Sequence, residues 1–188
     1  GALEGARAGA LVGGEDLGTV EPGVRDVLSE AGVLSTRLLL FEDEPPSTWR
    51  AQATAAITTH DLPTIAGVWS GIDLADRRAA GTTIPADGDD DFRRHLGMHY
   101  GQAGPDTSGR TVEEVIVDVH RRIGASPCVL ATATLDDLVG AEHRPNVPGT
   151  IDEHPNWRIP LPIPLDDLPG HPLAEAVVAA ISETRPPG

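Results

Sequence analysis

The stretch AGALVGGEDLGTVEPGVRDVLSEAG, residues 8–32, predicts a strand, a loop and a helix in succession. Its opening run AGALVG is short, apolar and bounded by glycine, which is typical of a strand buried on both faces of a parallel sheet. Pro22 suits a first helical turn and Gly32 a helix end, so we expect a helix over residues 22–31. One face of that helix carries three apolar residues, Val24, Val27 and Leu28.

The same kind of unit recurs along the chain. Apolar runs at residues 36–41, 53–59 and 128–133 each predict a further strand. Helical spacing follows at residues 65–81 and again in TVEEVIVDVHRRIG, residues 111–124, which has a threonine cap, glutamates in its first turn and arginines in its last. Four strands alternating with helices predict an α/β fold with a parallel sheet.

The carboxyl-terminal part of the chain breaks this pattern. Residues 146–172 are rich in proline, so we expect an ordered but irregular strap. Proline-rich segments can also bind proline-recognition modules, but the apolar residues embedded here, Trp157 among them, favour packing against the rest of the fold. Helical patterns predict a short helix at residues 92–100 and a closing helix at residues 173–182.

The composition narrows the choice of partners. Twenty-nine acidic residues against fourteen basic ones give a formal charge of −15, which repels nucleic acid and anionic membrane surfaces. The apolar runs fall well short of the roughly 20 residues that cross a bilayer, and the N-terminus lacks the features of a signal peptide. We therefore expect a soluble cytoplasmic protein that binds a neutral ligand and neither nucleic acid nor a membrane.

Acidic residues follow two of the predicted strands. Glu15 and Asp16 come after the first run, and His60 and Asp61 come after the run at residues 53–59. Active groups of parallel α/β folds gather at the carboxyl ends of strands. Two carboxyl groups flanking an acetal bond, roughly 5 to 5.5 Å apart, perform glycoside transfer with retention of configuration. Carboxylates also bind metals, but these residues supply too few ligands to indicate a metal site.

Three motifs together resemble the carboxyl-terminal half of the 4-alpha-glucanotransferases, also called amylomaltases or disproportionating enzymes, which are relatives of the alpha-amylases. The motifs are GEDLGTVEPGVRDVLSEAGVLSTRLLLFE at residues 14–42, TTHDLPTIAGVWSG at 58–71 and NVPGTIDEHPNWRIPLP at 146–162. The resemblance implies a TIM-type (β/α)8 barrel. It implies one domain over residues 1–188, with about strands five to eight in residues 8–145 and the strap and final helix in residues 146–188.

The resemblance also implies roles for single residues. Glu15 takes the place of the general acid/base, and Asp61 that of the aspartate that stabilises the transition state. His60, Asn146 and Pro148 take the places of substrate contacts. The implied reaction transfers alpha-1,4-glucan segments between maltooligosaccharides by a retaining double displacement, without a cofactor or a metal.

One catalytic group of the family has no counterpart in the sequence. The family's aspartate nucleophile lies on strand four, and no segment here resembles its motif. Because the chain opens at Gly1 and its only methionine is Met98, we expect a piece of a longer protein in which the missing amino-terminal half of the barrel supplies the nucleophile. We expect the piece to be inactive alone, with two exposed sheet edges that favour self-association.

Other interpretations of the same residues stay open at this point. The parent could be a maltodextrin hydrolase of the alpha-amylase superfamily, or the chain could be a glucan-binding fragment without catalysis. Glu15 could belong to a solvated turn, with Asp16 in a supporting hydrogen-bond role. Asp61 could cap a helix that has Pro63 in its first turn.

The remaining aromatic, histidine and cysteine residues predict mostly structural roles. Trp49, Trp69 and Trp157 could each stack on a sugar ring. Trp49, in a loop, is the better candidate, whereas Trp69 falls on the apolar face of a helix and belongs to the core. His95 and His99 have the spacing of a zinc pair but no evident third ligand. Cys128 precedes apolar residues and predicts a buried structural thiol.

Overall fold

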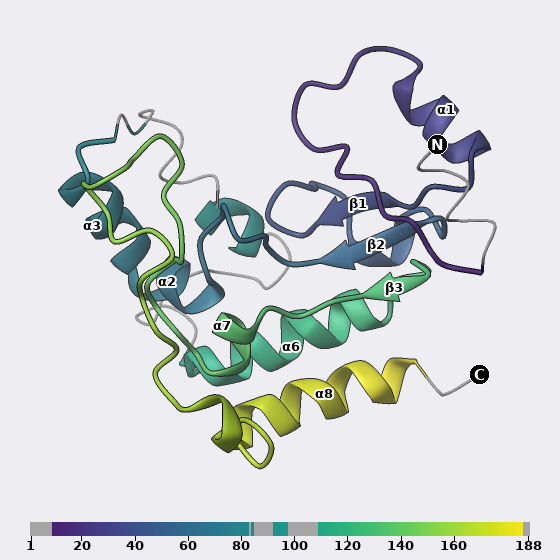
Figure 1. Cartoon of the computed structure of the whole chain (residues 1–188). Coiled ribbons are helices and arrows are strands. Elements are labelled where there is room, and N and C mark those ends of the chain that lie inside the picture. The colour runs from purple at the N-terminus through teal and green to yellow at the C-terminus, as the bar shows by residue number, and fades with distance from the viewer. Residues whose placement is uncertain (1–8, 83, 85–91, 98–108, 186–188) are drawn as a thin grey trace.

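A parallel sheet of three short strands forms the centre of the computed structural model, which describes residues 9–82, 84, 92–97 and 109–185. The strands β1 (Ser35–Leu38), β2 (Ala53–Ala56) and β3 (Leu130–Ala131) lie side by side in that order (Figure 1). Ser35 pairs with Ala53, and Thr54 pairs with Leu130. The α/β class and the parallel direction predicted from the sequence are therefore confirmed.

The prediction of a regular first strand is wrong. Residue 8 lies outside the described residues, and in place of a strand over residues 9–13 the chain makes one isolated parallel bridge between Gly13 and Leu34. The Leu34 amide donates to Val12 O, and the Gly14 amide donates to Leu34 O, each at 2.8 Å. Leu11 is 61% exposed, so the run is not buried on both faces. The run still extends the sheet beyond β1, in the order that the repeat predicted.

The other predicted strands are shorter than their apolar runs. After β1 the chain turns at once, because the amides of Phe41 and Glu42 both donate to Leu38 O. Leu39 nevertheless still donates to Ala56 O at 2.9 Å, so contact with β2 outlasts the regular strand. The run at residues 128–133 provides only two residues to β3.

The helix α1 (Val24–Glu30) forms within the predicted range, but its apolar face is not covered. Val24 and Val27 are exposed, Val27 by 65%, and the helix buries no residue completely. In Figure 1 α1 lies beyond the β1 edge of the sheet, away from the main helical layer. The apolar face that the sequence gives this helix is therefore largely exposed in the described chain.

Residues 65–81 form two helices rather than one. The helices α2 (Ile65–Ser70) and α3 (Ile72–Ala79) meet at Gly71, whose φ of 84° is a left-handed conformation that glycine adopts without strain. Gly67 lies against the backbone oxygen of Glu142, and a Cβ at this position would clash with it. The absence of a side chain thus lets the later segment approach α2 closely.

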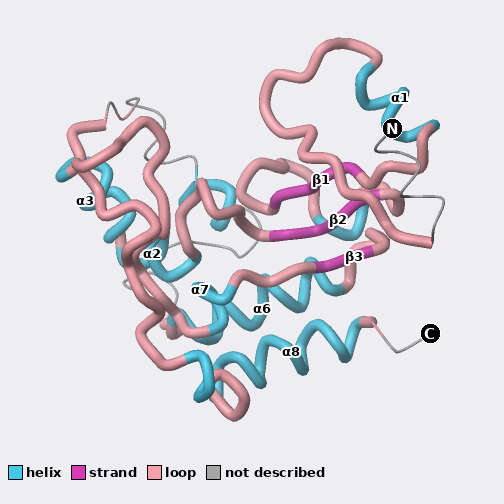
Figure 2. Tube along the Cα trace, in the orientation of Figure 1, coloured by secondary structure: helices cyan, strands magenta, loops and turns pink. Residues whose placement is uncertain are grey.

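The main helical layer confirms the strongest sequence predictions. The helix α6 (Val112–Gly124) begins with a capping box, in which Thr111 accepts from the Glu114 amide and Glu114 accepts from the Thr111 amide. Its apolar residues join those of β2 and of α8 (Pro172–Thr184) in the hydrophobic core. Figure 2 shows α6 and α8 running alongside each other below the strands. Cys128 is buried in the same core, as predicted.

The segment between the last strand and α8 is mostly irregular, as the prolines predicted. It contains the four-residue helix α7 (Leu135–Leu138), which the sequence reasoning missed, and the 3-10 helix η4 (Leu165–Asp167). A further 3-10 helix, η3 (Pro46–Thr48), lies between β1 and β2. Residues 92–97 are helical, and the rest of the helix predicted at 92–100 lies outside the described residues. No helix in the described parts of the chain is long and apolar enough to span a membrane.

Candidate active site

The two neighbouring acids of the GEDLG motif have opposite environments. Asp16 is buried, whereas Glu15 is exposed to solvent. Asp16 accepts hydrogen bonds from the Thr36 amide and the Ser35 hydroxyl, both at 2.8 Å, and pairs with Arg25 at 3.2 Å. Asp16 therefore fixes the motif to the start of β1 and to α1. The supporting role predicted for it is confirmed.

The same contacts decide the charge of Asp16. Burial alone would raise the pKa of this carboxyl group, because it disfavours the charged form. The hydrogen bonds from Thr36 and Ser35, together with the charge of Arg25, act in the opposite direction and hold the pKa below its usual value. Asp16 is thus an anionic anchor, and Glu15 beside it is presented to solvent with its carboxyl group accessible to a ligand.

The second acidic motif lies directly after β2. The Leu62 amide donates to Thr59 O at 3.1 Å, and the Asp61 amide donates to the Thr59 hydroxyl at 3.3 Å, which closes a tight turn. His60 Nε2 lies 3.5 Å from Asp61 Oδ2, and both side chains are about half exposed. The turn therefore presents an imidazole and a carboxylate together at the carboxyl end of the strand.

The loop that contains Asn146 and Pro148 reaches this turn from far along the chain. Asn146 Nδ2 donates to Asp61 Oδ1 at 2.6 Å. Pro148 is exposed two residues further on, in a turn closed by the hydrogen bond from the Thr150 hydroxyl to Val147 O at 2.7 Å. The structure thus brings His60, Asp61 and Asn146 together, with Pro148 in the adjoining turn.

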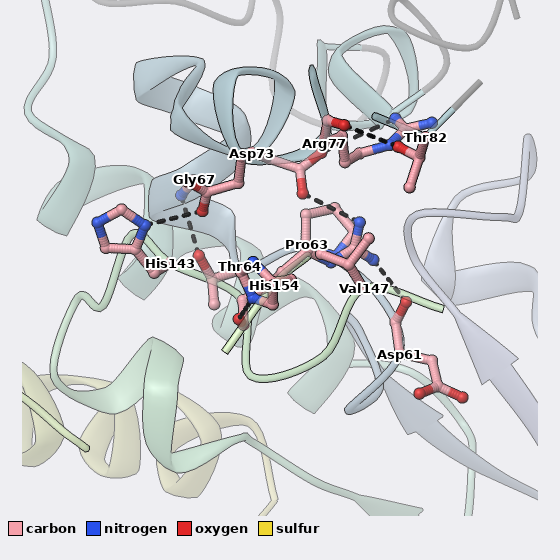
Figure 3. A network of polar contacts seen from close by, with 12 residues as sticks. Asp61, Pro63, Thr64, Gly67, Asp73, Arg77, Thr82, His143, Val147 and His154 are labelled. Carbon is pink, nitrogen blue, oxygen red and sulfur yellow. Dashed lines mark hydrogen bonds and ion pairs between the residues drawn. The ribbon is translucent and has the colours of Figure 1, made fainter. Parts of the chain in front are cut away.

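A buried arginine that the sequence reasoning missed holds the backbone of Asp61. Arg144 donates from one guanidinium nitrogen to Asp61 O, and another lies 3.1 Å from Asp73 Oδ1. Burial lowers the pKa of Arg144, and the neighbouring charge of Asp73 counteracts this effect. Figure 3 shows the main-chain oxygen of Asp61 facing this network while its carboxylate points away. The network therefore orients Asp61 without using its side chain.

The helix that follows Asp61 is capped by other residues than predicted. Thr64, not Asp61, is the N-cap of α2 and accepts from the Gly67 amide at 3.0 Å. Asp137, fully buried in α7, accepts from the Ile65 amide at 2.9 Å. Burial raises the pKa of Asp137 to about 6, although the bonds from Ile65 and Thr134 favour the charged form. Asp61 is thus left without a capping role.

Only one of the three tryptophans, Trp69, lies in the environment that the sequence predicted. Trp49 is buried, and its Nε1 donates to Glu44 O at 3.1 Å, so the prediction of a stacking residue there is wrong. Trp69 is buried in the core, as predicted. Trp157 is 63% exposed, with its ring centroid 5.6 Å from that of His60, so the expected packing of this ring against the fold is wrong.

Nothing in the described residues indicates a metal site. They contain no group of three or more histidine, cysteine, aspartate or glutamate side chains placed to hold an ion. His95 is buried and lies 3.2 Å from Asp43 Oδ1. Its predicted zinc partner, His99, lies outside the described residues.

The arrangement suits acid-base chemistry on a hydroxyl-rich ligand. Glu15 and Asp61 both follow the carboxyl ends of parallel segments, and β1 lies between those segments. Exposed carboxylates can accept hydrogen bonds from hydroxyl groups, and a carboxylic acid can protonate a leaving oxygen. The sequence alone indicated these two positions through their place after apolar runs. It could not indicate Arg144 and Asp73, because neither falls in a recognisable pattern.

Comparisons with known proteins agree on one family. Residues 2–165 match the sequence profile of the 4-alpha-glucanotransferases. The chain is 38% identical over 211 residues to 4-alpha-glucanotransferases of Mycobacterium bovis and Mycobacterium tuberculosis, with 95% of the chain aligned. The crystal structure of amylomaltase from Corynebacterium glutamicum is 31% identical, with a TM-score of 0.83 over 96% of the chain and 30% of that protein. The amylomaltase of Streptococcus agalactiae, 17% identical with a TM-score of 0.58, shows likeness of fold.

The lengths differ markedly. The chain spans 28% of the length of the mycobacterial relatives that it matches.

Proposed function

This chain belongs to the 4-alpha-glucanotransferase family, and we propose that it supplies part of an active site that transfers alpha-1,4-glucan segments between maltooligosaccharides. The observation that carries the proposal is the placement of Glu15 and of the cluster His60, Asp61 and Asn146 after the carboxyl ends of parallel segments. That edge is where parallel α/β enzymes gather their active groups.

The fold supports a barrel assignment within this proposal. The Gly13 bridge, β1, β2 and β3 follow one another in sequence and in space, as strands five to eight of a (β/α)8 barrel would. The exposed face of α1 and the exposed run at Leu11 are consistent with surfaces that further barrel units cover. In this arrangement residues 146–185 form the strap and closing helix behind the last strand.

Each site residue has a distinct role in the proposed reaction. Glu15, protonated, donates its proton to the glycosidic oxygen as the bond to the leaving glucan breaks. In the second step the same carboxylate takes the proton from the hydroxyl group of the incoming glucan. Asp61 accepts hydrogen bonds from hydroxyl groups of the sugar that is cleaved, and His60 donates to the same sugar.

The orientation of Asp61 supports this division of labour. Asn146 binds one carboxylate oxygen of Asp61, and Arg144 fixes its backbone. The second carboxylate oxygen, with His60 beside it, is left facing the exposed side of the turn. Hydrogen bonds that are positioned before the sugar distorts stabilise the transition state without reorganisation.

A retaining double displacement also needs a carboxylate nucleophile, about 5 Å from the acid. We propose that this nucleophile comes from protein sequence outside the 188 residues. The chain would then act only when combined with that sequence. In the assembled site, exclusion of water from the covalent intermediate would favour transfer to a second glucan over hydrolysis.

Product analysis from maltotriose tests the proposal. We expect no turnover by the chain alone, and maltotetraose and longer products when it is co-expressed with whatever its gene encodes upstream of residue 1. Glu15→Gln, which keeps the side-chain shape and removes the acid, should lower that rate by about 10²- to 10⁴-fold. Glu21→Gln, a loop substitution in the next turn of chain, serves as the matched control and should leave the rate unchanged.

Three outcomes would contradict parts of the proposal. Turnover by the chain alone would place the nucleophile within these residues. Glucose and maltose as sole products would identify a hydrolase rather than a transferase. A full rate in the Glu15→Gln protein would remove this residue from the reaction.

A further inference from the structure

The indole ring of Trp157 is exposed to solvent beside the candidate site. The chain contains three tryptophans, and the other two, Trp49 and Trp69, are buried in the core. The Trp157 side chain is 63% exposed and its ring lies 5.6 Å from the imidazole of His60, at an interplanar angle of 45°. An aromatic ring of this size is normally placed where it can cover apolar surface, and its exposure next to a candidate binding residue leaves its face available to a ligand.

We propose that Trp157 is a sugar-binding platform, on which one glucosyl ring of the glucan stacks while His60 and Asp61 bind hydroxyl groups of a neighbouring ring. This inference rests on the proposed function, because it takes the glucan as the ligand. A pyranose ring suits the position, since it offers a flat apolar face to the indole and hydroxyl groups at its rim to polar neighbours. It is also neutral, as a chain with a formal charge of −15 favours.

The backbone at Trp157 supports a ligand-binding role. Among the non-glycine residues that the structure describes, Trp157 alone has a positive φ, 60°. Residues with bulky side chains avoid this region, and such strain persists where the surroundings hold the residue in place, often at binding sites. The conformation is held by the Trp157 amide, which donates to Pro145 O at 2.9 Å.

Asn156 connects the platform to the rest of the site. Its Oδ1 accepts from the Val147 amide at 2.9 Å, and its Nδ2 donates to the Thr150 hydroxyl at 2.8 Å and to the Thr150 backbone oxygen. The turn at residues 146–150 is therefore built around Asn156, and that turn also carries Asn146, which binds Asp61. One loop thus positions both the exposed indole and a partner of the candidate catalytic carboxylate.

The tryptophan distribution provides a direct optical test. A collisional quencher such as acrylamide reaches the exposed Trp157 far more readily than the two buried tryptophans. We expect saturating maltoheptaose to protect the wild-type fluorescence from acrylamide, and Trp157→Phe to abolish most of that protection. The assay uses the same assembled protein as the transfer assay, and the difference between its wild-type and Trp157→Phe forms separates Trp157 from any tryptophans in the added sequence. It reads binding without turnover.

Affinity measurements by calorimetry complete the test. Trp157→Leu, which keeps apolar bulk but loses the flat face, should bind maltoheptaose about tenfold more weakly, whereas Trp157→Phe should retain most of the affinity. Trp49→Phe is the matched control and should bind as the wild type does. Equal thermal unfolding of the Trp157 variants and the wild type would separate lost stacking from lost folding.

The possible failures are distinguishable. Wild-type affinity in the Trp157→Leu protein, or acrylamide access that maltoheptaose does not change in a protein that binds it, would overturn the platform and leave the proposed function standing. Equal transfer rates in the wild-type and Trp157→Leu proteins at low maltotriose concentration would do the same. No binding of maltoheptaose by the wild-type protein would overturn both.

Discussion

The two acidic motifs of this molecule are held in opposite ways. In GEDLG the anchor is the adjacent residue, because Asp16 is buried and bonded to β1 and α1 while Glu15 faces solvent. In the turn after β2 the anchors come from more than 80 residues away, since Arg144 holds the backbone of Asp61 and Asn146 holds its carboxylate. Exposed carboxylates of the candidate site can thus be positioned by neighbours in sequence or by a distant loop.

The difference has consequences for stability and for pH dependence. The local anchor is a carboxylate whose pKa lies below its usual value. The region after β2 depends on a buried ion pair and on Asp137, whose pKa is raised to about 6. Substitutions should therefore destabilise the region of the second motif more than that of the first. Rising pH should strengthen the contribution of Asp16 to stability and weaken that of Asp137.

Arg144→Ala should have the largest effect. It removes a guanidinium that is buried against Asp73 and leaves that carboxylate without its closest partner on this loop, which typically costs about 3–5 kcal/mol. Urea denaturation monitored by circular dichroism gives the change in the free energy of unfolding. Arg158→Ala, an exposed arginine on the same loop, is the control and should change it by less than about 0.5 kcal/mol. Equal effects of the two substitutions would show that the distant anchor contributes little.

Asp137→Asn should change how stability depends on pH. Because burial raises the pKa of Asp137 to about 6, its contribution is fully present below about pH 4, where the unfolded chain is also protonated, and is lost as pH rises through 6. Asparagine is neutral at every pH, so its contribution to the free energy of unfolding does not change with pH. Relative to wild type, the variant should therefore gain about 3 kcal/mol between pH 4 and pH 7.5.

Thermal and urea unfolding at several pH values measure this gain. The difference between the two proteins isolates Asp137, because other titrating groups such as His120 are present in both. A pH-independent difference would mean that Asp137 keeps an ordinary pKa in the folded protein.

Asp16→Asn should have a smaller effect on stability, and its dependence on pH should be opposite to that of Asp137→Asn. At neutral pH it weakens the bonds from Thr36, Ser35 and Arg25, and should cost about 2 kcal/mol. Since the folded pKa of Asp16 is lowered, wild type should lose this advantage as pH falls through that pKa, so the two proteins should become alike in acid. Glu15→Gln is the matched control, and its exposed side chain should contribute less than about 0.5 kcal/mol. A larger cost for Glu15→Gln than for Asp16→Asn would reverse the roles assigned to the pair.

The sequence predicted the elements whose signals are local. The capping box at Thr111 and the helical spacing of residues 112–124 lie within one helix, and that helix formed as expected. The strand order also followed from the alternation of apolar runs. The extent of a strand depends on its neighbours, however, and the first run has one described neighbour, Leu34, so it forms a single bridge rather than a strand.

The residues of the candidate site divide in the same way between local and distant signals. Glu15 and Asp61 stand out because each follows an apolar run, and Asn146 stands out through the motif that carries it. Arg144 is an isolated arginine in a polar segment, where burial cannot be deduced from spacing. The exposure of Trp157 contradicts its apolar character, and only the position of His60 beside it gives that exposure a meaning. Contacts between segments 80 residues apart have no signature in a single sequence.

Asn146→Ala should have the smallest effect on stability. Comparing it with Arg144→Ala separates the anchor of the Asp61 carboxylate from the anchor of its backbone. The hydrogen bond to Asp61 Oδ1 is short, but the Asp61 side chain is 46% exposed, so water can replace the lost donor and the cost should be about 1 kcal/mol or less. Asn146→Asp puts a second negative charge beside Asp61 and should cost more than the alanine variant, and the excess should shrink at high salt because exposed charges are screened. Urea denaturation at low and high ionic strength measures both differences. If Asn146→Ala destabilises the protein as much as Arg144→Ala, the side chain of Asp61 rather than its backbone is what the distant loop holds.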